Sequence, residues 1–202
     1  MFTGLIEEIG IVIAMNTSES GSQLKLAAPR VAKTMRRGDS LAVNGCCLTL
    51  SSHRGEELVF DLLDETIART NLKNLPPKQP VNLERAVART ERFGGHFVQG
   101  HIDCVSPIIA YQKTGADFRL EIELPRAFGQ YVAYKGAIAV NGISLTVAEV
   151  LPKSFVVWII PYTKTHTNLD RVQAGDLMNL EFDILAKYVE RMLSRHVPKS
   201  SH

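Results

Sequence analysis

The sequence predicts an all-β protein in which one small antiparallel barrel occurs twice in tandem, followed by a C-terminal amphipathic α-helix. A ten-residue segment, LAVNGCCLTL at residues 41–50, recurs as IAVNGISLTV at residues 138–147, with six positions identical. Both halves contain short runs of β-forming residues, several of which alternate polar with apolar positions, separated by turn residues. The chain then carries a stripe of apolar residues at helical spacing that neither half repeats.

The repeat extends beyond this decapeptide. Asn71 recurs 97 positions later as Asn168, and matched pairs earlier in each half lie 96 positions apart. A period of this length indicates a duplicated domain and not a solenoid repeat. We therefore expect one barrel over residues 1–92 and a second over residues 97–183, with a short hinge at Gly94–Gly95 between them.

Strands are expected wherever the pattern has a period of two or is rich in β-formers. Alternation predicts strands over residues 22–28 and 117–124, and β-branched and aromatic residues predict strands over 57–63 and 153–160. The segments are short and bounded by Gly, Pro, Asp or Asn, which is typical of a small antiparallel barrel.

Two short helices are expected within the first half. One covers residues 30–37 and stops at Gly38. The other begins near Asp64, which suits an N-cap, and runs to Asn71.

The C-terminal segment differs from the rest. Apolar residues at positions 184, 185, 188, 189, 192 and 193 predict one amphipathic helix over residues 184–196. Such a helix outside both repeats either caps a barrel or pairs with copies of itself. Residues 197–202 are expected to be disordered.

Composition excludes several function classes. The net charge is only +2, which gives no argument for nucleic acid or an anionic membrane surface. Three cysteines, two of them adjacent, make neither a disulfide framework nor a zinc motif. The apolar N-terminus contains Glu7 and Glu8, so it suits neither a signal peptide nor a membrane span. A cytoplasmic protein is expected.

The positions at which the two copies disagree carry the information about chemistry. Cys47 stands opposite Ser144, and Leu5 stands opposite His101. Each has a structural alternative: neighbouring Cys46 and Cys47 point to opposite faces of a strand, so at least one is expected in the core, and buried cysteines are commonly inert. His101 also suits an ordinary strand edge.

Other polar residues have equally simple interpretations. His166 is expected on a solvated helix end opposite Arg69, and Asn44 and Asn141 precede glycines as turn residues. No phosphate-binding loop, dinucleotide fingerprint or metal-ligand spacing occurs. The residues alone therefore predict a duplicated barrel that binds a ligand, without naming the ligand.

Four motifs resemble one known family. MFTGLIE, NGCCLT, GGHFVQGHID and YKGAIAVNGISLTV look like riboflavin synthase of the duplicated-barrel type, over essentially the whole chain. The resemblance implies two six-stranded Greek-key antiparallel barrels and a homotrimer held partly by C-terminal helices. It also implies a transferase without metal or redox cofactor, in which two molecules of 6,7-dimethyl-8-ribityllumazine exchange a four-carbon unit. One becomes riboflavin and the other becomes 5-amino-6-(D-ribitylamino)uracil.

The resemblance further implies the site residues. The catalytic set is Cys47 from one wall and His101 with Ser144 from the other, between the first barrel of one subunit and the second barrel of its neighbour. The first-barrel substrate site is expected to comprise Gly4, Leu5, Ile6, Leu48, Thr49, Asp61, Leu62, Leu63, Asp64, Glu65 and Thr66. The second is expected to comprise Gly100, Ile102, Lys135, Leu145, Thr146, Ile159, Ile160, Pro161, Tyr162 and Thr163. Phe2, Thr3 and Asn141 complete the expected substrate-binding residues, although many family members carry Asp where this chain has Asn141.

Two rival interpretations fit the same fold. A non-catalytic antenna protein that binds lumazine or flavin would keep the binding residues and lose the reactive set. A flavin-binding barrel of an oxidoreductase would need a nicotinamide-binding domain, for which this chain has neither motif nor room. The family resemblance leaves open whether the trimer associates with a lumazine synthase shell.

Overall fold

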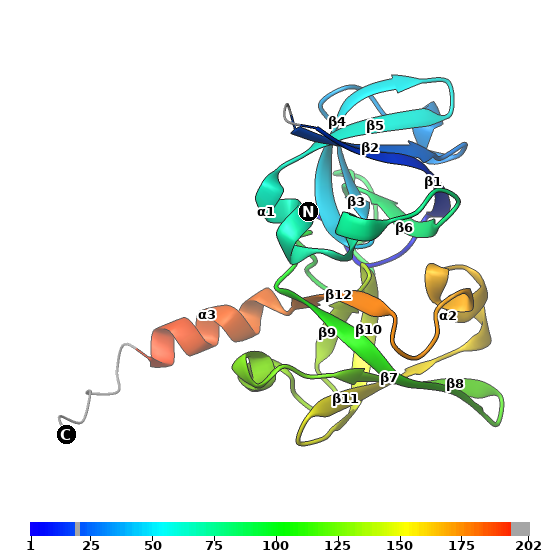
Figure 1. The fold of residues 1–202 in the computed structure, drawn as a ribbon. Helices are drawn as coiled ribbons and strands as arrows, with labels where there is room; N and C mark the ends of the chain where they lie inside the picture. The colour runs from blue at the N-terminus through cyan, green and yellow to red at the C-terminus, as the bar shows by residue number, and fades with distance from the viewer. Residues whose placement is uncertain (19–20, 195–202) are drawn as a thin grey trace.

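The computed structural model describes residues 1–18 and 21–194 and contains two closed six-stranded antiparallel barrels stacked on each other, with a helix projecting from the second (Figure 1). This confirms the predicted fold class. Barrel 1 consists of β1 (Glu8–Ser18), β2 (Gly21–Ala27), β3 (Ser40–Val43), β4 (Cys46–Arg54), β5 (Glu57–Leu62) and β6 (Pro80–Arg85). Barrel 2 consists of β7 (Cys104–Thr114), β8 (Asp117–Glu123), β9 (Ala137–Val140), β10 (Ile143–Val150), β11 (Ser154–Ile159) and β12 (Leu177–Phe182).

Both barrels have the same strand order. Barrel 1 closes as β1-β2-β5-β4-β3-β6, and barrel 2 as β7-β8-β11-β10-β9-β12. In each, the second strand pairs with the fifth instead of the third, which is the crossover of a Greek key. The hairpin β3–β4 turns through Asn44 and Gly45, both with positive φ, as a two-residue type I′ turn requires, and β9–β10 repeats it with Asn141 and Gly142.

The interior of each barrel is filled by apolar side chains. Leu24, Leu41 and Phe60 are fully buried in barrel 1, and Leu120 and Phe155 are fully buried in barrel 2. The alternating segments predicted from the sequence supply these side chains, because successive residues of a strand point to opposite faces. The barrels are therefore filled scaffolds, and ligands must bind outside them.

Short helices connect the strands. They are η1 (Val31–Lys33), α1 (Asp64–Arg69), η2 (Asn71–Asn74), η3 (Arg126–Tyr131), α2 (Pro161–Thr165) and η4 (Asn168–Asp170), of which the η elements are 3₁₀ turns. The helix expected over residues 30–37 is thus a single turn, because the Asp39 carboxylate accepts a hydrogen bond from Arg36 N–H (2.8 Å) and starts a new turn there. Asp64 is the first helical residue, and Leu63 is the N-cap.

The first residues of each repeat cross to the other barrel. We call residues 2–6 and 98–102 the crossing segments; they pair through Phe2 N–H to Val98 C=O (2.7 Å) and Val98 N–H to Phe2 C=O (3.2 Å). Ile6 packs against the core of barrel 2, and Ile102 packs against the core of barrel 1. The covalent halves of the chain are therefore not the same as its packing units.

Six asparagines join the barrels about a pseudo-two-fold axis: Asn44, Asn71, Asn82, Asn141, Asn168 and Asn179. Asn82 Nδ2 donates to Asn141 C=O (3.0 Å), and its counterpart Asn179 Nδ2 donates to Asn44 C=O (2.9 Å). Between them, a Cβ on either hairpin glycine would lie within 2.8 Å of the other's backbone. This close contact explains why both turns end in glycine.

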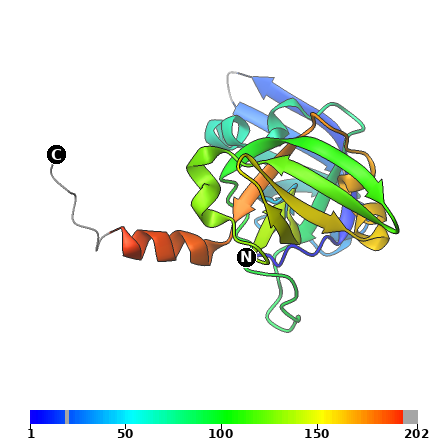
Figure 2. The same cartoon turned by 90° about the horizontal axis from the view of Figure 1, so that it is seen from below.

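The terminal helix α3 (Ile184–Leu193) is anchored at its base. The Asp183 carboxylate caps it by accepting from Leu185 N–H (2.9 Å), and Lys187 Nζ lies 2.6 Å from the Asp103 carboxylate. The hydroxyl of Tyr131 donates to Glu190. Figure 2 shows α3 projecting away from the barrels, and the predicted residues 195 and 196 of the helix and the tail 197–202 lie outside the described residues.

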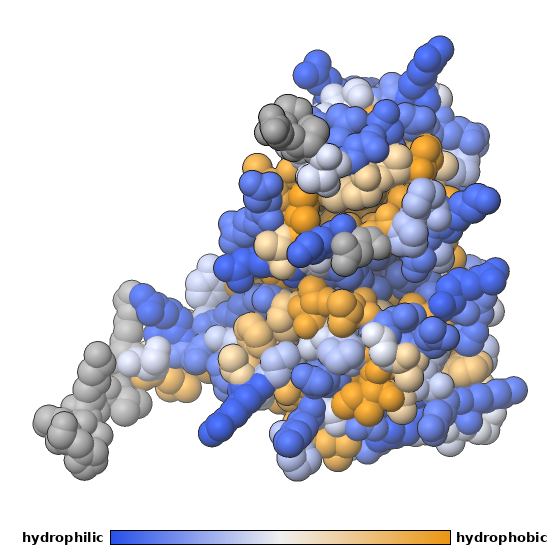
Figure 3. All heavy atoms as spheres, in the orientation of Figure 1, coloured by the Kyte–Doolittle hydropathy of each residue, from blue (hydrophilic) through white to orange (hydrophobic). Residues whose placement is uncertain are grey.

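One face of α3 is largely exposed in the single chain. Its large apolar side chains are between 54% and 63% exposed: Leu185, Tyr188, Val189, Met192 and Leu193. Figure 3 shows apolar atoms along this projecting helix. Among the described residues, no helix is long and apolar enough to cross a membrane.

Candidate active site

Each crossing segment is held against the start of a strand of the barrel that it crosses to. Ser144 N–H on β10 donates to Gly4 C=O (2.8 Å), and Cys47 N–H on β4 donates to Gly100 C=O (2.9 Å). A Cβ at Gly4 would lie 2.5 Å from Ser144 Cβ, and a Cβ at Gly100 would lie 2.5 Å from Cys47 Cβ. Glycine is required at both places, where φ is also positive, so the two reactive strand positions sit in equivalent backbone settings.

This exchange corrects the expected grouping of site residues. Gly4, Leu5 and Ile6 belong with Ser144 on barrel 2, and Gly100, His101 and Ile102 belong with Cys47 on barrel 1. Within one chain, Gly100, the residue before His101, is therefore bonded to Cys47 and not to Ser144, which differs from the expected grouping of His101 with Ser144. The sequence offset of 96 aligned the repeats correctly but carried no sign that their first residues change places.

Two buried carboxylates fix the crossing segments. The Glu84 carboxylate accepts hydrogen bonds from Thr3 N–H (2.7 Å) and Gly4 N–H (3.0 Å). Its counterpart Glu181 accepts from Gln99, Gly100 and His101 N–H at 2.6, 2.9 and 3.0 Å. Burial raises the pKa of Glu84, and it raises the pKa of Glu181 to about 7 against the opposing effect of the backbone donors.

Ser144 has a second partner that sequence reasoning missed. His96 Nδ1 lies 2.6 Å from Ser144 Oγ, while His96 N–H donates to Thr3 C=O (3.1 Å). Burial lowers the pKa of His96, and the Asp183 carboxylate opposes that shift. The neutral imidazole can therefore accept the Ser144 hydroxyl proton, an arrangement that makes a hydroxyl more nucleophilic or orients a water. The signal available in the sequence was a histidine directly after the Gly94–Gly95 hinge.

The adjacent cysteines divide as the strand alternation predicts. Cys46 is buried in the core of barrel 1, where burial raises the pKa of its thiol to about 12. Cys47 is only half-buried and packs beside Phe2 and Val98 in a small cluster between the barrels. Cys46 is thus an inert core residue, and Cys47 is the cysteine available at a surface.

A cavity of about 1010 Å³ lies between barrel 1 and α2. It is lined by the crossing segment with Leu5 and Ile6, by Ile143 and Ser144, and by Tyr162, Thr163, Thr165, His166 and Thr167 of barrel 2. Carboxylates and arginines complete the lining: Glu7, Glu8, Arg30, Glu84, Arg85, Glu91 and Arg92. Its volume suits a drug-sized ligand.

Several expected binding residues turn their side chains away from solvent. Leu48, Leu62 and Ile159 are in the barrel cores, and Phe2 is fully buried between the barrels. A ligand could meet only their backbone. Leu145 is half-buried against the barrel 2 core.

The remaining expected residues lie on or next to β4, β5 and α1 of barrel 1 and their counterparts β10, β11 and α2 of barrel 2. The exposed side chains are Thr49, Asp61, Leu63, Asp64, Glu65, Thr146, Ile160, Pro161 and Tyr162; those of Thr66 and Thr163 are half-buried. Asp61 accepts from Gln23 Nε2 (3.0 Å). The surface of barrel 1 around Asp61 and Glu65 is therefore open to solvent in the single chain.

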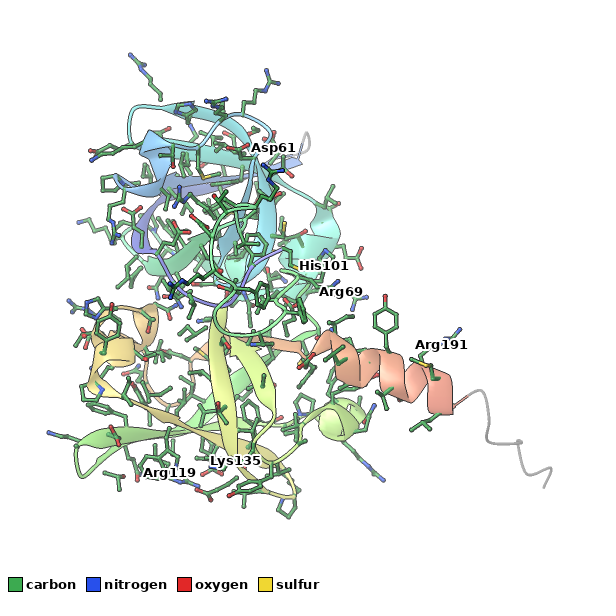
Figure 4. All side chains as sticks on the ribbon, turned by 180° about the vertical axis from the view of Figure 1, so that it is seen from behind. Asp61, Arg69, His101, Arg119, Lys135 and Arg191 are labelled. Carbon is green, nitrogen blue, oxygen red and sulfur yellow. The ribbon has the colours of Figure 1, made fainter. Side chains whose placement is uncertain are left out.

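Two expected residues lie elsewhere. Figure 4 places Lys135 at the outer end of barrel 2, away from His101 and Asp61. Asn141 is buried in the asparagine network, where its Oδ1 accepts from Asn179 N–H (2.8 Å) and Asn71 Nδ2 (3.0 Å). These are the contacts of a structural amide, so Asn141 needs no charge at that position.

The described residues contain no group of three or more His, Cys, Asp or Glu side chains placed to hold a metal ion. The fold and the paired settings of Cys47 and Ser144 define a tandem-barrel protein whose two equivalent strand positions carry a thiol in one copy and a hydroxyl in the other.

Comparison with known proteins identifies the family. The lumazine binding domain matches twice, at residues 3–86 and 99–183. The riboflavin synthase of Actinobacillus pleuropneumoniae is 40% identical over 193 residues, covering 96% of this chain and 90% of that protein. That of Schizosaccharomyces pombe is 38% identical over 200 residues, covering 98% and 96%. The chain belongs to the riboflavin synthase family of tandem lumazine-binding domains.

A solved structure shares the fold at lower identity. LumP in complex with riboflavin superposes with a TM-score of 0.84 at 22% identity, covering 90% of this chain and 99% of that chain. This likeness supports the fold alone.

Proposed function

We propose that the chain is a riboflavin synthase, a transferase that converts two molecules of 6,7-dimethyl-8-ribityllumazine into riboflavin and 5-amino-6-(D-ribitylamino)uracil. The atoms of the two products together equal those of two substrate molecules, so the reaction needs no oxidant, reductant or other co-reactant. The observation that carries the proposal is the pair of equivalent backbone settings that present Cys47 in one copy and Ser144 in the other.

The duplicated fold suits this reaction because the two substrates are identical but act differently. Each barrel can hold one lumazine, and one molecule gives four carbons to the other. A common scaffold with different reactive side chains therefore fits the reaction better than two identical sites. Holding both molecules in place replaces a bimolecular encounter, which contributes up to about 7–11 kcal/mol in ideal cases.

The reactive residues divide between the two sites. At the first site His101 follows Gly100, whose carbonyl is bonded to Cys47 N–H, and at the second His96 is hydrogen-bonded to Ser144. The chemistry requires removal of a proton from the C7 methyl of one lumazine and a polar group or activated water near C7 of the other. A histidine serves as proton carrier near neutral pH, and a neighbouring hydroxyl or thiol supplies the polar group.

A second copy of the chain is part of the proposal. The polar surface of barrel 1 around Asp61 is exposed, Lys135 lies far from it, and the apolar face of α3 is open to solvent. We propose a cytoplasmic homotrimer in which the first site of one subunit faces the second site of its neighbour, with Lys135 supplied across that interface.

Turnover of the purified protein tests this function. Incubation with 6,7-dimethyl-8-ribityllumazine should produce one riboflavin and one pyrimidine for every two lumazines consumed, measured by absorbance and chromatography. Lumazine that binds tightly and is never consumed would show a non-catalytic antenna protein instead.

A further inference from the structure

The helices α1 and α2 occupy equivalent places in the two repeats and carry different side-chain pairs one turn apart. In barrel 1, Arg69 Nε lies 3.0 Å from the Glu65 carboxylate. In barrel 2, their counterparts Tyr162 and His166, each 97 positions later, stack with ring centroids 4.0 Å apart and planes 17° apart. An exposed ion pair in one site thus stands where the other has two stacked rings.

The hydrogen bonds of His166 fix its orientation. His166 Nδ1 lies 2.9 Å from Tyr162 C=O, which can only accept a hydrogen bond. It also lies 3.0 Å from the hydroxyl of Thr165, which donates to the carbonyls of Pro161 and Tyr162 and so offers His166 a lone pair. Nδ1 therefore carries the hydrogen, and Nε2 of the neutral ring keeps its lone pair.

His166 forms part of the wall of the 1010 Å³ cavity, and its neighbours there are hydroxyls. Thr163, Thr165 and Thr167 line the same cavity, as do the crossing segment and Ser144. The hydroxyl of Thr167 is buried and donates to Thr163 C=O (2.7 Å), so Thr163, Thr165 and His166 are the groups left for a ligand. A lumazine has two ends, a flat ring that reacts and a ribityl chain of hydroxyls. A ring placed at Ser144 leaves the rest of this cavity, including Thr163 and His166, for the chain.

We propose that His166 is a specificity-determining residue of the second site, whose Nε2 accepts a hydrogen bond from a ribityl hydroxyl. Tyr162 holds the imidazole plane in position by stacking. The inference rests on the proposed function for the identity of the ligand. Arg69, the counterpart in barrel 1, is always charged and can only donate hydrogen bonds. The two barrels therefore offer a ribityl chain a donor at one position and an acceptor at its equivalent.

Equilibrium binding of two ligands tests the inference without relying on turnover. Riboflavin carries the ribityl chain, and lumichrome has a closely related flat ring system without it. His166→Phe keeps a ring against Tyr162 and removes both nitrogens. In fluorescence titrations of the full-length protein, we expect riboflavin affinity at half of the sites to fall about tenfold, the loss of one hydrogen bond, with lumichrome affinity unchanged.

Two further variants sharpen the result. His166→Gln places a polar group near the former Nε2 and should restore most of the riboflavin affinity. His53→Phe, at an exposed position of β4, is the matched control and should change neither ligand. Equal loss for both ligands, or no loss for either, in a folded His166→Phe protein would overturn the inference. Failure of the wild-type protein to turn over lumazine would instead contradict the proposed function, because it leaves the binding comparison intact.

Discussion

At the scale of single residues, the two adjacent cysteines have opposite environments because neighbours on β4 point to opposite faces. Cys46 is in the barrel core and Cys47 faces the junction of the barrels. We expect Cys46→Ala to lower the free energy of unfolding by about 1 kcal/mol, through a small cavity, with turnover near normal. Chemical denaturation and the turnover assay measure the two effects.

Cys47→Ala should show the reverse pattern, with turnover reduced and stability nearly unchanged. Cys47→Ser should keep part of the activity, because the equivalent position in barrel 2 already carries the hydroxyl of Ser144. A stable Cys46→Ala protein without turnover, beside a fully active Cys47→Ala protein, would contradict the assignment.

The hydrogen bond between His96 and Ser144 predicts that these residues act as one unit. We expect His96→Phe and Ser144→Ala each to lower kcat about 10²-fold, the low end for acid–base catalysis. The double variant should be no slower than the worse single variant, because residues that act together are not additive. Effects that multiply would show two independent roles.

The pH dependence of turnover gives a second check on His96. Burial lowers the pKa of His96, and only the neutral imidazole can accept a proton. Activity that depends on this base should therefore rise with pH through a pKa below that of an ordinary histidine.

At the scale of elements, the carboxylate of Glu181 on β12, which holds the second crossing segment, makes the stability of the fold depend on pH. Its pKa is raised from 4.5 to about 7 in the folded protein, so between these values the folded chain binds more protons than the unfolded chain. The contribution of Glu181 to the free energy of unfolding is at most about 3 kcal/mol. It is present at pH 4 and is lost as pH rises through 7. Comparing Tm of wild type and Glu181→Gln from pH 5 to 8 isolates it from other groups.

The stability advantage of the wild type over Glu181→Gln should shrink as pH rises across this range. An advantage that grows with pH would show that the three N–H donors outweigh burial, hold Glu181 ionised and lower its pKa.

The terminal helix α3 provides the element-scale test of assembly. Its apolar face includes Val189, and Arg191 is an exposed charged residue of the same helix (Figure 4). Val189→Asp places a charge in an interface that we propose is buried, so we expect monomers or dimers by sedimentation and most activity lost. Arg191→Ala is the matched control on the same helix. A trimeric, fully active Val189→Asp protein would contradict the role of α3.

At the scale of the whole molecule, the local sequence pattern predicted the strands and helices but did not predict that the two crossing segments exchange barrels. The duplicated decapeptide, the alternating strands and the apolar stripe after Asp183 were enough for the barrels and helix, since each is a short-range signal. The crossing of residues 2–6 and 98–102 depends on contacts such as Gly4 with Ser144, which are far apart in sequence. For the same reason, the contacts of Gly100 with Cys47 and of His96 with Ser144 could not be predicted from local pattern.

The measurement that tests the account most directly is complementation between subunits. One variant carries Cys47→Ala with His101→Phe and is inactive at its first site; the other carries Ser144→Ala with His96→Phe and is inactive at its second. If each reaction joins the first site of one subunit to the second site of its neighbour, co-expressed trimers should recover activity. In a closed ring, each interface needs an intact first site from one subunit and an intact second site from its neighbour. With random mixing each is present in about half of the cases, so about a quarter of the interfaces are intact. Recovery to about a quarter of wild-type turnover is the predicted result, and co-purified mixed trimers as inactive as either variant alone would contradict it.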